Sequence, residues 1–464
     1  MALRECESDT IAAIATPIGE GGIGIVRVSG ADAIQIVSKI FFPKAGQPIA
    51  SMKSYTAALG QVRDEEGKLV DEGILLVMRA PKTYTTEDLV EIQLHGSGVV
   101  LAKTLELLIA GGARLAGKGE FTKRAFLNGR MDLMQAEAVL DLIQAKTDQG
   151  RRWALSQLEG ALSKKIVEMK NDLLLVLSHL EAAIDFPDDQ LDTQSHTEIL
   201  QRLEDLRVRL EALLKNSAAG LLLKRGLRVA LWGRPNAGKS SLMNCLAKHN
   251  RVIVAAVPGT TRDVVEEEIR IKDIPVRILD TAGIQETDNL IEKEGVRRSR
   301  QAAESADLVL FVADASVECV ESDRSLFAEI ERQKKIVVLN KADLPHRFDP
   351  ASLGLDVSDT VVVKTSCVTE GGIDELETIL LKQVLGGLLE SSDEVLVSSV
   401  RQKDALDRTL SLVRQAIHSC EQKLSPELVA VDIRETLDCL GLLIGDIVTD
   451  DMLDVLFSQF CIGK

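Results

Sequence analysis

LRVALWGRPNAGKS, residues 227–240, is the stretch that decides the fold of the central part of the chain. A short apolar, β-forming run leads into a glycine-rich loop, and SSLMNCLAK at 240–248 then has helical spacing. Strand, loop and helix in this order predict a phosphate loop, whose backbone amides face the phosphates of a nucleotide. Lys239 would neutralise the outer phosphates, and the Ser240 hydroxyl would ligate magnesium. A chance match to a glycine-rich turn is the alternative, which the flanking strand and helix disfavour.

Further motifs follow in the order expected of a GTP site: GTTRD at 259–263, DTAG at 280–283, NKAD at 340–343 and Ser366-Cys367 after VVVKTS. The carboxylate at the end of NKAD can accept two hydrogen bonds from guanine, at positions where adenine has no donors. We therefore predict GTP with Mg²⁺, the metal ligands being Ser240 and Thr261. The predicted GTP-binding residues are Asn236, Ala237, Gly238, Lys239, Ser240, Ser241, Thr260, Thr261, Asp280, Thr281, Ala282, Gly283, Asn340, Lys341, Asp343, Ser366, Cys367 and Val368.

The residue after DTAG is unusual. Ordinary small GTPases have a glutamine there that orients the attacking water, whereas this chain has Ile284. Another group must therefore activate water, and the carboxylates nearby are Glu286, Asp288, Glu292 and Glu294. In the phosphate loop, the Asn236 amide could hold a monovalent cation against the phosphates, or it could simply stabilise the loop.

The texture of the sequence changes along its 464 residues, a length that suits two to four domains. Short β-rich runs (LRVALW, PVRILD, DLVLFVAD, KIVVLN and VVVKTS) alternate with helix-like segments, which predicts a mostly parallel sheet. Leu-rich helical patterning flanks this part on both sides, and the N-terminal part has glycine-rich turns between short strands. We predict a multidomain α+β and α/β protein with an N-terminal α+β domain at 1–118, helical parts at 119–220 and 386–464, and an inserted α/β domain at 226–385.

Composition limits the possible partners. The formal net charge is −16 and aromatic residues make up 3%, so there is no general attraction to phosphate backbones and little material for base stacking. The basic stretch at 114–130, with net charge +4, is the local exception. The sequence has no apolar run long enough for a membrane span, and its cysteines have no zinc-ligand spacing, which favours a cytoplasmic protein without disulfides.

With these motifs in place, the chain resembles the MnmE (TrmE) family of bacterial tRNA-modification GTPases over its whole length. The resemblance rests on the GTP motifs together with DTIAAIATPIGEGGIGIVRVSG (9–30), TYTTEDLVEIQLHG (83–96), GEFTKRAFLNGRMDLMQAEAVLDLI (119–143), SPELVAVDIRETLDCLG (425–441) and the terminal FCIGK. It implies an N-terminal domain that binds a tetrahydrofolate derivative (5,10-methylene or 5-formyl) and forms a homodimer, and a helical domain interrupted by the G domain.

The resemblance also implies residue roles and partners. Glu292 would activate water, and K⁺ would be held by Asn236, Ala255, Val257 and Thr260. The folate pocket would include Arg27, Glu91, Arg130 and Lys464, with Cys461 as a catalytic cysteine. The implied activity is a potassium-stimulated GTPase that works with an FAD-dependent protein resembling MnmG (GidA). Together they would add a (carboxymethyl)aminomethyl group to carbon 5 of the wobble uridine of certain tRNAs.

Simpler interpretations stand beside these. By residue type alone, Arg27, Glu91 and Arg130 could be ordinary surface charges and Cys461 an inert thiol. A ribosome-assembly GTPase of the Era or Der type, acting as an RNA-binding switch, is the alternative function, and a structural dimerising scaffold is a third. For the C-terminus we expect a helix with an apolar stripe at Met452, Val455, Leu456 and Phe460, ended by Gly463.

Overall fold

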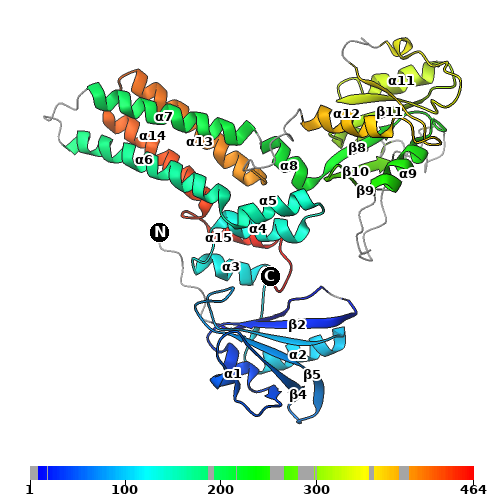
Figure 1. Ribbon diagram of the computed structural model, residues 1–464. Helices are drawn as coiled ribbons and strands as arrows, with labels where there is room; N and C mark the ends of the chain where they lie inside the picture. The colour runs from blue at the N-terminus through cyan, green and yellow to red at the C-terminus, as the bar shows by residue number, and fades with distance from the viewer. Residues whose placement is uncertain are drawn as a thin grey trace. The chain divides into compact units, whose positions relative to one another are not determined.

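The computed structural model describes residues 9–17, 19–185, 193–215, 217–250, 266–280, 297, 300–354, 360–385 and 397–464 (Figure 1). The chain forms two compact units, each built from separate stretches of sequence. The first unit contains residues 1–140, 156–207 and 405–464, and the second contains 141–155 and 208–404. Among the described helices, none is long and apolar enough to span a membrane.

The N-terminal part of the first unit is a seven-stranded sheet in the order β3-β4-β5-β6-β2-β1-β7, antiparallel except for the β1–β7 pair. Its elements are β1 (Ile11–Ile14), β2 (Gly21–Ser29), α1 (Ala33–Val37), β3 (Phe41–Pro43), η1 (Ile49–Ser51), β4 (Thr56–Arg63), β5 (Leu69–Met78), β6 (Leu89–Gly96), α2 (Gly98–Ala110) and β7 (Arg114–Leu115).

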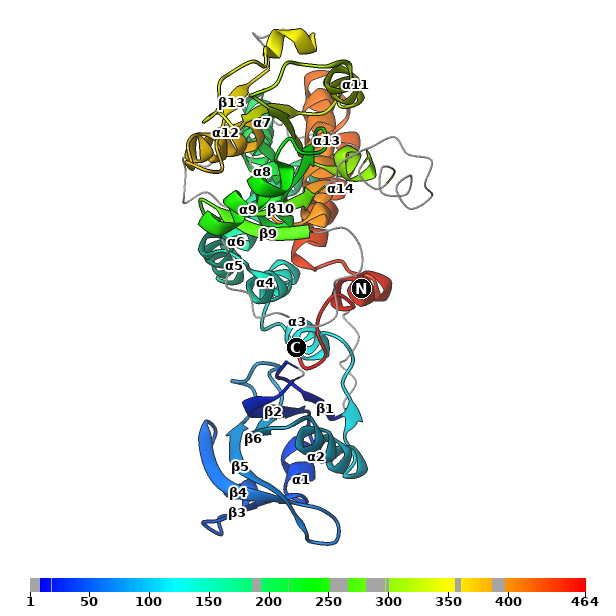
Figure 2. The ribbon, with the colours of Figure 1, turned by 90° about the vertical axis from the view of Figure 1, so that its right-hand side faces the viewer.

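Helices α1 and α2 cover one face of this sheet, as Figure 2 shows, and their apolar residues share one core with alternate residues of the strands. Val26 and Val28 of β2, for example, are fully buried in that core. Successive side chains of a strand point to opposite faces, so Arg27 of β2 and its cross-strand neighbour Glu91 of β6 lie on the other face. The predicted α+β character of this region is confirmed.

The rest of the first unit is helical. Buried residues recur at three- and four-residue steps in α7, at Ile199, Leu203, Leu206 and Leu210, as the sequence predicted, and α6 packs along α14. A small apolar cluster joins α3, α4 and α15. The helices that lie wholly or mostly in this unit are α3 (Glu120–Leu127), α4 (Leu133–Gln144), α6 (Ala161–Asp185), α7 (Thr193–Lys215), α13 (Val400–Glu421), α14 (Pro426–Ile444) and α15 (Asp450–Phe457), whereas most of α5 (Asp148–Leu158) belongs to the second unit.

The second unit contains a six-stranded sheet in the order β13-β12-β11-β8-β10-β9. All its pairs are parallel except β9–β10. The mostly parallel α/β domain is therefore confirmed, with one addition. Strand β9, EEEIRI, was not among the predicted strands because its buried residues, Ile269 and Ile271, are too few to stand out among charged neighbours. The elements are α8 (Ser217–Arg225), β8 (Leu227–Trp232), α9 (Lys239–Asn250), β9 (Glu266–Ile271), β10 (Ile274–Asp280), β11 (Leu308–Asp314), α11 (Glu321–Glu329), β12 (Lys335–Asn340), η2 (Pro350–Leu353), β13 (Val362–Lys364) and α12 (Ile373–Leu385).

Two apolar cores lie on the two faces of this sheet, which is why its central strands are apolar throughout. One core joins the strands to α9 and α12, and the other joins them to α11. The indole of Trp232 is buried in the second and donates to the carbonyl oxygen of Leu326 at 2.8 Å. The carboxyl ends of β8, β11 and β12 consequently meet at one edge of the sheet, where loops are positioned to bind a ligand.

Candidate functional site

The predicted phosphate loop leaves β8 at Gly233 and enters α9 at Lys239. Two positions in this loop require glycine because neighbouring residues lie too close for a side chain. A Cβ at Gly233, where φ is 143°, would lie 2.2 Å from the carbonyl oxygen of Val312, and a Cβ at Gly238 would lie 2.1 Å from the amide nitrogen of Asn340. Asn236 has a left-handed backbone with φ of 63°. The loop therefore wraps tightly against the ends of β11 and β12.

Lys239 lies folded across this loop. Its ammonium donates to the carbonyl oxygens of Gly233 and Arg234 at 2.7 and 2.8 Å, and the residue is buried. Ser240 and Ser241 follow at the exposed start of α9. Because the backbone amides at a helix N-terminus attract anions, this arrangement suits a phosphate chain.

The base-recognition motifs converge on the same loop. The Asn340 amide donates to the carbonyl oxygen of Ala237 at 3.2 Å, and its oxygen faces Thr365 and the thiol of Cys367. Burial raises the pKa of Cys367 to about 11, so this thiol is protonated at neutral pH and can donate. Asp343 accepts a hydrogen bond of 2.6 Å from the Ser366 hydroxyl.

A cavity of about 460 Å³ lies between these motifs. Its walls include the predicted residues Gly238, Ser241, Asn340, Lys341, Asp343, Cys367 and Val368. They also include Asn244, Cys245, Lys248, Leu344 and Glu370, which sequence reasoning missed. Asn244, Cys245 and Lys248 come from the helix after the phosphate loop, and the helical pattern gave no signal for which face would line a cavity.

Several predicted site residues cannot be compared with this geometry because they lie outside the described part of the chain. Asp280 is the last residue of β10 and pairs with Leu231 of β8, but its side chain also lies outside the described part of the chain. The other residues in this group are Ala255, Val257, Thr260, Thr261, Thr281, Ala282, Gly283, Ile284, Glu286, Asp288, Glu292 and Glu294.

A second set of predicted residues comes together in the first unit. Arg27 donates to Glu91 at 2.9 Å and, through another nitrogen, to the carbonyl oxygen of Gly463 at 3.2 Å. Burial and the charge of Arg27 lower the pKa of Lys464. The contribution from Arg27, which is smaller than that of burial, places two cations near each other, an arrangement that an anion would stabilise.

Aromatic rings, which sequence reasoning missed, complete this set. The guanidinium of Arg27 lies 5.8 Å from the ring centre of Tyr84 and 5.6 Å from that of Phe121. The guanidinium of Arg130 lies 4.7 Å from the ring centre of Tyr84. It also donates to the backbone carbonyl oxygen of Tyr84 at 2.8 Å. Cys461 is exposed nearby in the chain, and its carbonyl oxygen accepts from the amide of Gly119 at 3.3 Å. Tyr84 is part of the TYTTED motif, so the tyrosine in that motif was the sequence signal that could have pointed to this site.

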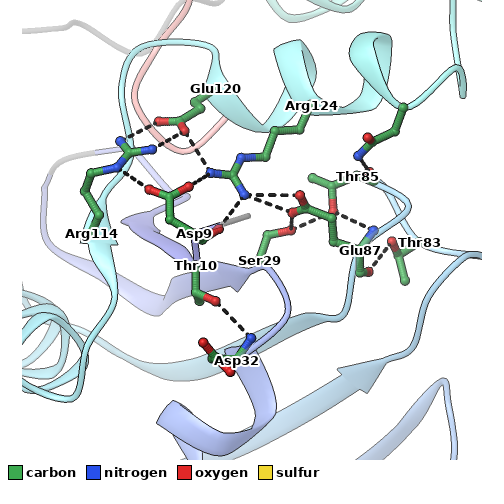
Figure 3. A network of polar contacts seen from close by, with 11 residues as sticks. Asp9, Thr10, Ser29, Asp32, Thr83, Thr85, Glu87, Arg114, Glu120 and Arg124 are labelled. Atoms are coloured by element: carbon green, nitrogen blue, oxygen red, sulfur yellow. Dashed lines mark hydrogen bonds and ion pairs between the residues drawn. The ribbon is translucent and has the colours of Figure 1, made fainter. Parts of the chain in front are cut away.

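The basic stretch at 114–130 differs from expectation. Figure 3 shows Arg124 at the centre of a network in which its guanidinium donates to Asp9, Glu87 and Glu120. Arg114 is paired with Asp9 and Glu120, and Lys123 of the same stretch with Asp454. Arg114, Lys123 and Arg124, which are three of the five cations in this stretch, are therefore paired with carboxylates within the unit.

The C-terminal helix also differs. Helix α15 ends at Phe457, not at Gly463, and Val455 of the predicted stripe is 67% exposed. Phe460 is buried, but it lies beyond the helix. Gly463 is needed for another reason: with φ of 93°, a Cβ there would lie 2.3 Å from the carbonyl oxygen of Ile14. The tail thus runs against the sheet, with Ile462 bridged to Lys118.

Comparison with known proteins covers almost the whole chain. A family model described as the GTP-binding protein TrmE N-terminus matches residues 10–130, and one described as the MnmE helical domain matches residues 133–461. The tRNA modification GTPase MnmE of Geobacillus kaustophilus is 45% identical over 460 residues, which are 99% of this chain and 100% of that protein. The protein of the same name from Lactobacillus acidophilus is 43% identical, over 99% of each chain.

Among solved structures, Aquifex aeolicus Era bound to GDP and aluminium fluoride is 29% identical, with a TM-score of 0.28 over 40% of this chain and 65% of that one. The full-length relatives and the two family models decide the assignment. The chain belongs to the MnmE family of tRNA modification GTPases.

Proposed function

We propose that this chain is a potassium-stimulated GTPase that acts with an FAD-dependent protein resembling MnmG (GidA). Together they would add a (carboxymethyl)aminomethyl group to carbon 5 of the wobble uridine of certain tRNAs. The observation that carries the proposal is the 45% identity, along 99% of the chain, to a relative named tRNA modification GTPase MnmE. The convergence of phosphate-loop and base-recognition residues around one cavity supports its GTPase part.

In the proposed GTP site, Lys239 and the amides of the phosphate loop bind the phosphates, and Asp343 reads guanine. Ser240, with Thr261, would hold Mg²⁺, which neutralises charge on the phosphates when bound. The exposed Asn236 offers an amide oxygen, a hard ligand of the kind that K⁺ accepts. Glu292 would orient the attacking water in place of the glutamine of other GTPases.

For the first unit we propose binding of a tetrahydrofolate derivative, which would supply a one-carbon unit when bound. The residues present suit such a ligand. Arg27 and Lys464 can bind its carboxylates, Glu91 can accept hydrogen bonds from its ring nitrogens, and the Tyr84 ring can pack against a flat heterocycle. An anion bound here would meet both Arg27 and Lys464, because Arg27 lies close enough for its charge to act on the Lys464 ammonium.

We also propose that the open face of the N-terminal sheet binds a second copy of the chain. Leu59 of β4 and Ile74 of β5 are directly opposite each other, and they are 50% and 43% exposed. Phe42 of β3 is also exposed, at 47%. Clustered exposed apolar side chains on a sheet face are typical of protein interfaces.

The central experiment is mass spectrometry of wobble uridines in tRNA from cells with and without this chain. We expect the modified nucleoside to disappear on deletion and to return when the wild-type chain is restored. An Asp343→Asn chain serves as the matched control, because it should be present at the same level without binding GTP well. Unchanged wobble nucleosides after deletion would contradict the proposed function.

The potassium and water roles are tested by single-turnover hydrolysis in KCl and NaCl at equal ionic strength. We expect faster hydrolysis in KCl, and loss of that difference in Asn236→Ala. Glu292→Ala should bind GTP normally but hydrolyse it about 10²-fold more slowly, the size of effect typical of a positioned general base. Equal rates in the two salts would contradict the potassium site, and a collapse of GTP affinity in Glu292→Ala would make that residue structural.

The folate site is tested by isothermal titration of the full chain and of a fragment covering residues 1–118. The fragment lacks Arg130 and Lys464, so it should bind tetrahydrofolate derivatives more weakly than the full chain. Equal affinities would contradict a pocket completed by the tail. Arg27→Ala in the full chain should weaken binding as well, because it removes a cation and the anchor of Gly463.

A further inference from the structure

Two residues of the nucleotide site share an uncommon backbone conformation. Asn236 in the phosphate loop and Lys341 in the NKAD motif are both left-handed, with φ of 63° and 62°. The ammonium of Lys341 joins them, because it donates to the carbonyl oxygen of Asn236 at 3.0 Å. The base-recognition loop is thereby tied to the loop that would cradle the phosphates.

Lys341 also pairs with a residue that belongs to none of the GTP motifs. Its ammonium lies 2.5 Å from a carboxylate oxygen of Asp314, the last residue of β11. Asp314 is directly opposite Asn340 in the parallel β11–β12 register, so its side chain starts beside the NKAD motif. The Asp314 side chain is 13% exposed.

Asp314 is itself held in place. Its other carboxylate oxygen accepts from the Ser316 amide at 2.9 Å and from the Ser316 hydroxyl at 2.6 Å. Burial alone would raise the pKa of Asp314, but the hydrogen bonds from Lys341 and Ser316 outweigh it and hold the pKa below its usual range. Asp314 is therefore a fixed anion at neutral pH, with both oxygens engaged.

A fixed anion at this position has a physical consequence for Lys341. A long cationic side chain has high rotamer entropy, and a left-handed backbone is unfavourable for a lysine. Such conformations persist where the surroundings over-determine them, and they cluster at ligand sites. The Asp314 carboxylate supplies that constraint, because it pins the ammonium in a position from which it can also reach the Asn236 carbonyl.

We propose that Asp314 is a positioning residue of the nucleotide site, which holds Lys341 across the phosphate loop so that the loop is shaped before nucleotide binds. This inference deepens the GTP site proposed above and rests on it. It predicts that Asp314 acts only through Lys341. Without Lys341, the identity of residue 314 should no longer matter for nucleotide affinity.

A double-mutant cycle in the full-length chain tests this dependence. The affinity of a fluorescent GDP analogue is measured for wild type, Asp314→Asn, Lys341→Ala and the double variant. Asparagine keeps the volume and can still accept from Ser316, but it presents an NH₂ to Lys341. We expect Asp314→Asn to weaken GDP binding about tenfold, the scale of one lost charge-assisted hydrogen bond. The double variant should match Lys341→Ala within about twofold, because residues of one network are not additive.

The matched control is Glu329→Gln in the same unit. This substitution removes the ion pair that Glu329, the last residue of α11, makes with Arg300. Neither residue lines the cavity. This variant should bind GDP like wild type. The proposal is overturned if Asp314→Asn binds GDP normally, if its effect adds in full to that of Lys341→Ala, or if Glu329→Gln weakens binding as much.

A second measurement needs no nucleotide. Hydrogen exchange of the peptide covering 233–241 should be faster in Asp314→Asn than in wild type, and equally fast in Lys341→Ala, while exchange in β8 stays unchanged. Unchanged exchange in the loop would contradict the positioning role. A wild-type chain that fails to bind GDP would instead contradict the nucleotide site, and the exchange comparison would still decide the role of Asp314.

Discussion

Arg27 and Glu91 form an ion pair across neighbouring antiparallel strands, with 2.9 Å between the Arg27 Nε and a carboxylate oxygen of Glu91. The two side chains are 15% and 14% exposed, so the pair is shielded from most of the solvent. The same guanidinium reaches the carbonyl oxygen of Gly463. A strand near the start of the chain therefore holds its last residues in place.

Deletion of residues 461–464 should separate the two activities of the chain. It removes the Gly463 contact with Arg27 and the bridge between Ile462 and Lys118, and all of these residues belong to the first unit. We expect GTP hydrolysis within about twofold of wild type and loss of wobble-uridine modification, measured by mass spectrometry of tRNA. Cys461→Ser keeps the tail and removes only the thiol, so loss of modification in this variant would indicate a reactive thiol and retained modification a packing residue. Wild-type modification by the truncated chain would show that the tail is not part of a site.

Asp343→Asn should change the base preference of the nucleotide site. The asparagine amide can donate to the additional carbonyl oxygen of xanthine, whereas guanine would lose the acceptor that it needs. We expect weaker GTP binding and relatively tighter binding of xanthosine triphosphate, measured by competition with a fluorescent GDP analogue. Ser366→Ala, which removes the hydroxyl that donates to Asp343, should weaken GTP binding without changing the preference. A GTP preference retained in Asp343→Asn would refute the assignment.

Arg124→Ala should destabilise the first unit strongly. The Arg124 side chain is only 3% exposed and faces three carboxylates, so its removal would take away the guanidinium that pairs with the mostly buried Glu87 and would leave Asp9 and Glu120 to Arg114 alone. Losses of this kind cost about 3–5 kcal/mol. Arg114→Ala is the control, because Arg114 meets two of the same carboxylates at 45% exposure and should cost about 1 kcal/mol or less. Thermal unfolding should rank the two variants in this order, and equal losses would contradict the buried network as the cause.

The same network predicts loss of stability in acid. Burial by itself would raise the pKa values of Asp9 and Glu120, but hydrogen bonds and charge from Arg114 and Arg124 outweigh it and lower both. A lowered folded-state pKa gives stability that is present above the unfolded pKa and is lost as pH falls through the folded pKa. With unfolded values near 4, the free energy of unfolding should fall below about pH 4. Unfolding followed from pH 7 to 3 should show this fall in wild type, and a smaller one in Arg124→Ala.

Asp273→Ala should loosen the start of α5. Asp273 lies in the turn between β9 and β10, and its carboxylate accepts from the backbone amide of Gln149 at 2.6 Å and from that of Asp148 at 3.3 Å. Loss of a capping side chain costs about 0.5–2 kcal/mol. Hydrogen exchange of the peptide covering 147–153 should therefore speed up. Asp273→Asn, which can still accept and tolerates the left-handed φ of 68°, should exchange nearly as wild type does. Equal exchange in both variants would mean that the cap does not hold this helix.

The sequence by itself determined the architecture and the location of the nucleotide site. Phosphate-loop spacing between a strand and a helix is a local property, and the apolar runs of β8, β11 and β12 required a sheet covered on both faces. Because the carboxyl ends of parallel strands share one edge, Gly238 and Asn340 had to approach each other. These features depend on residues close together in sequence, or on rules that hold for every sheet of this class.

Only the tertiary structure decided which charges are engaged and where the tail runs. The stretch 114–130 reads as basic, yet Arg114 and Arg124 are neutralised by Asp9, Glu87 and Glu120. The need for glycine at Gly463 was likewise set by the Ile14 carbonyl on β1, and the ion pair of Asp314 by the lysine that follows β12. The net charge of a stretch does not show which of its side chains form ion pairs. Pairing depends on contacts between residues distant in sequence, and such contacts exist only once the strands and helices have packed.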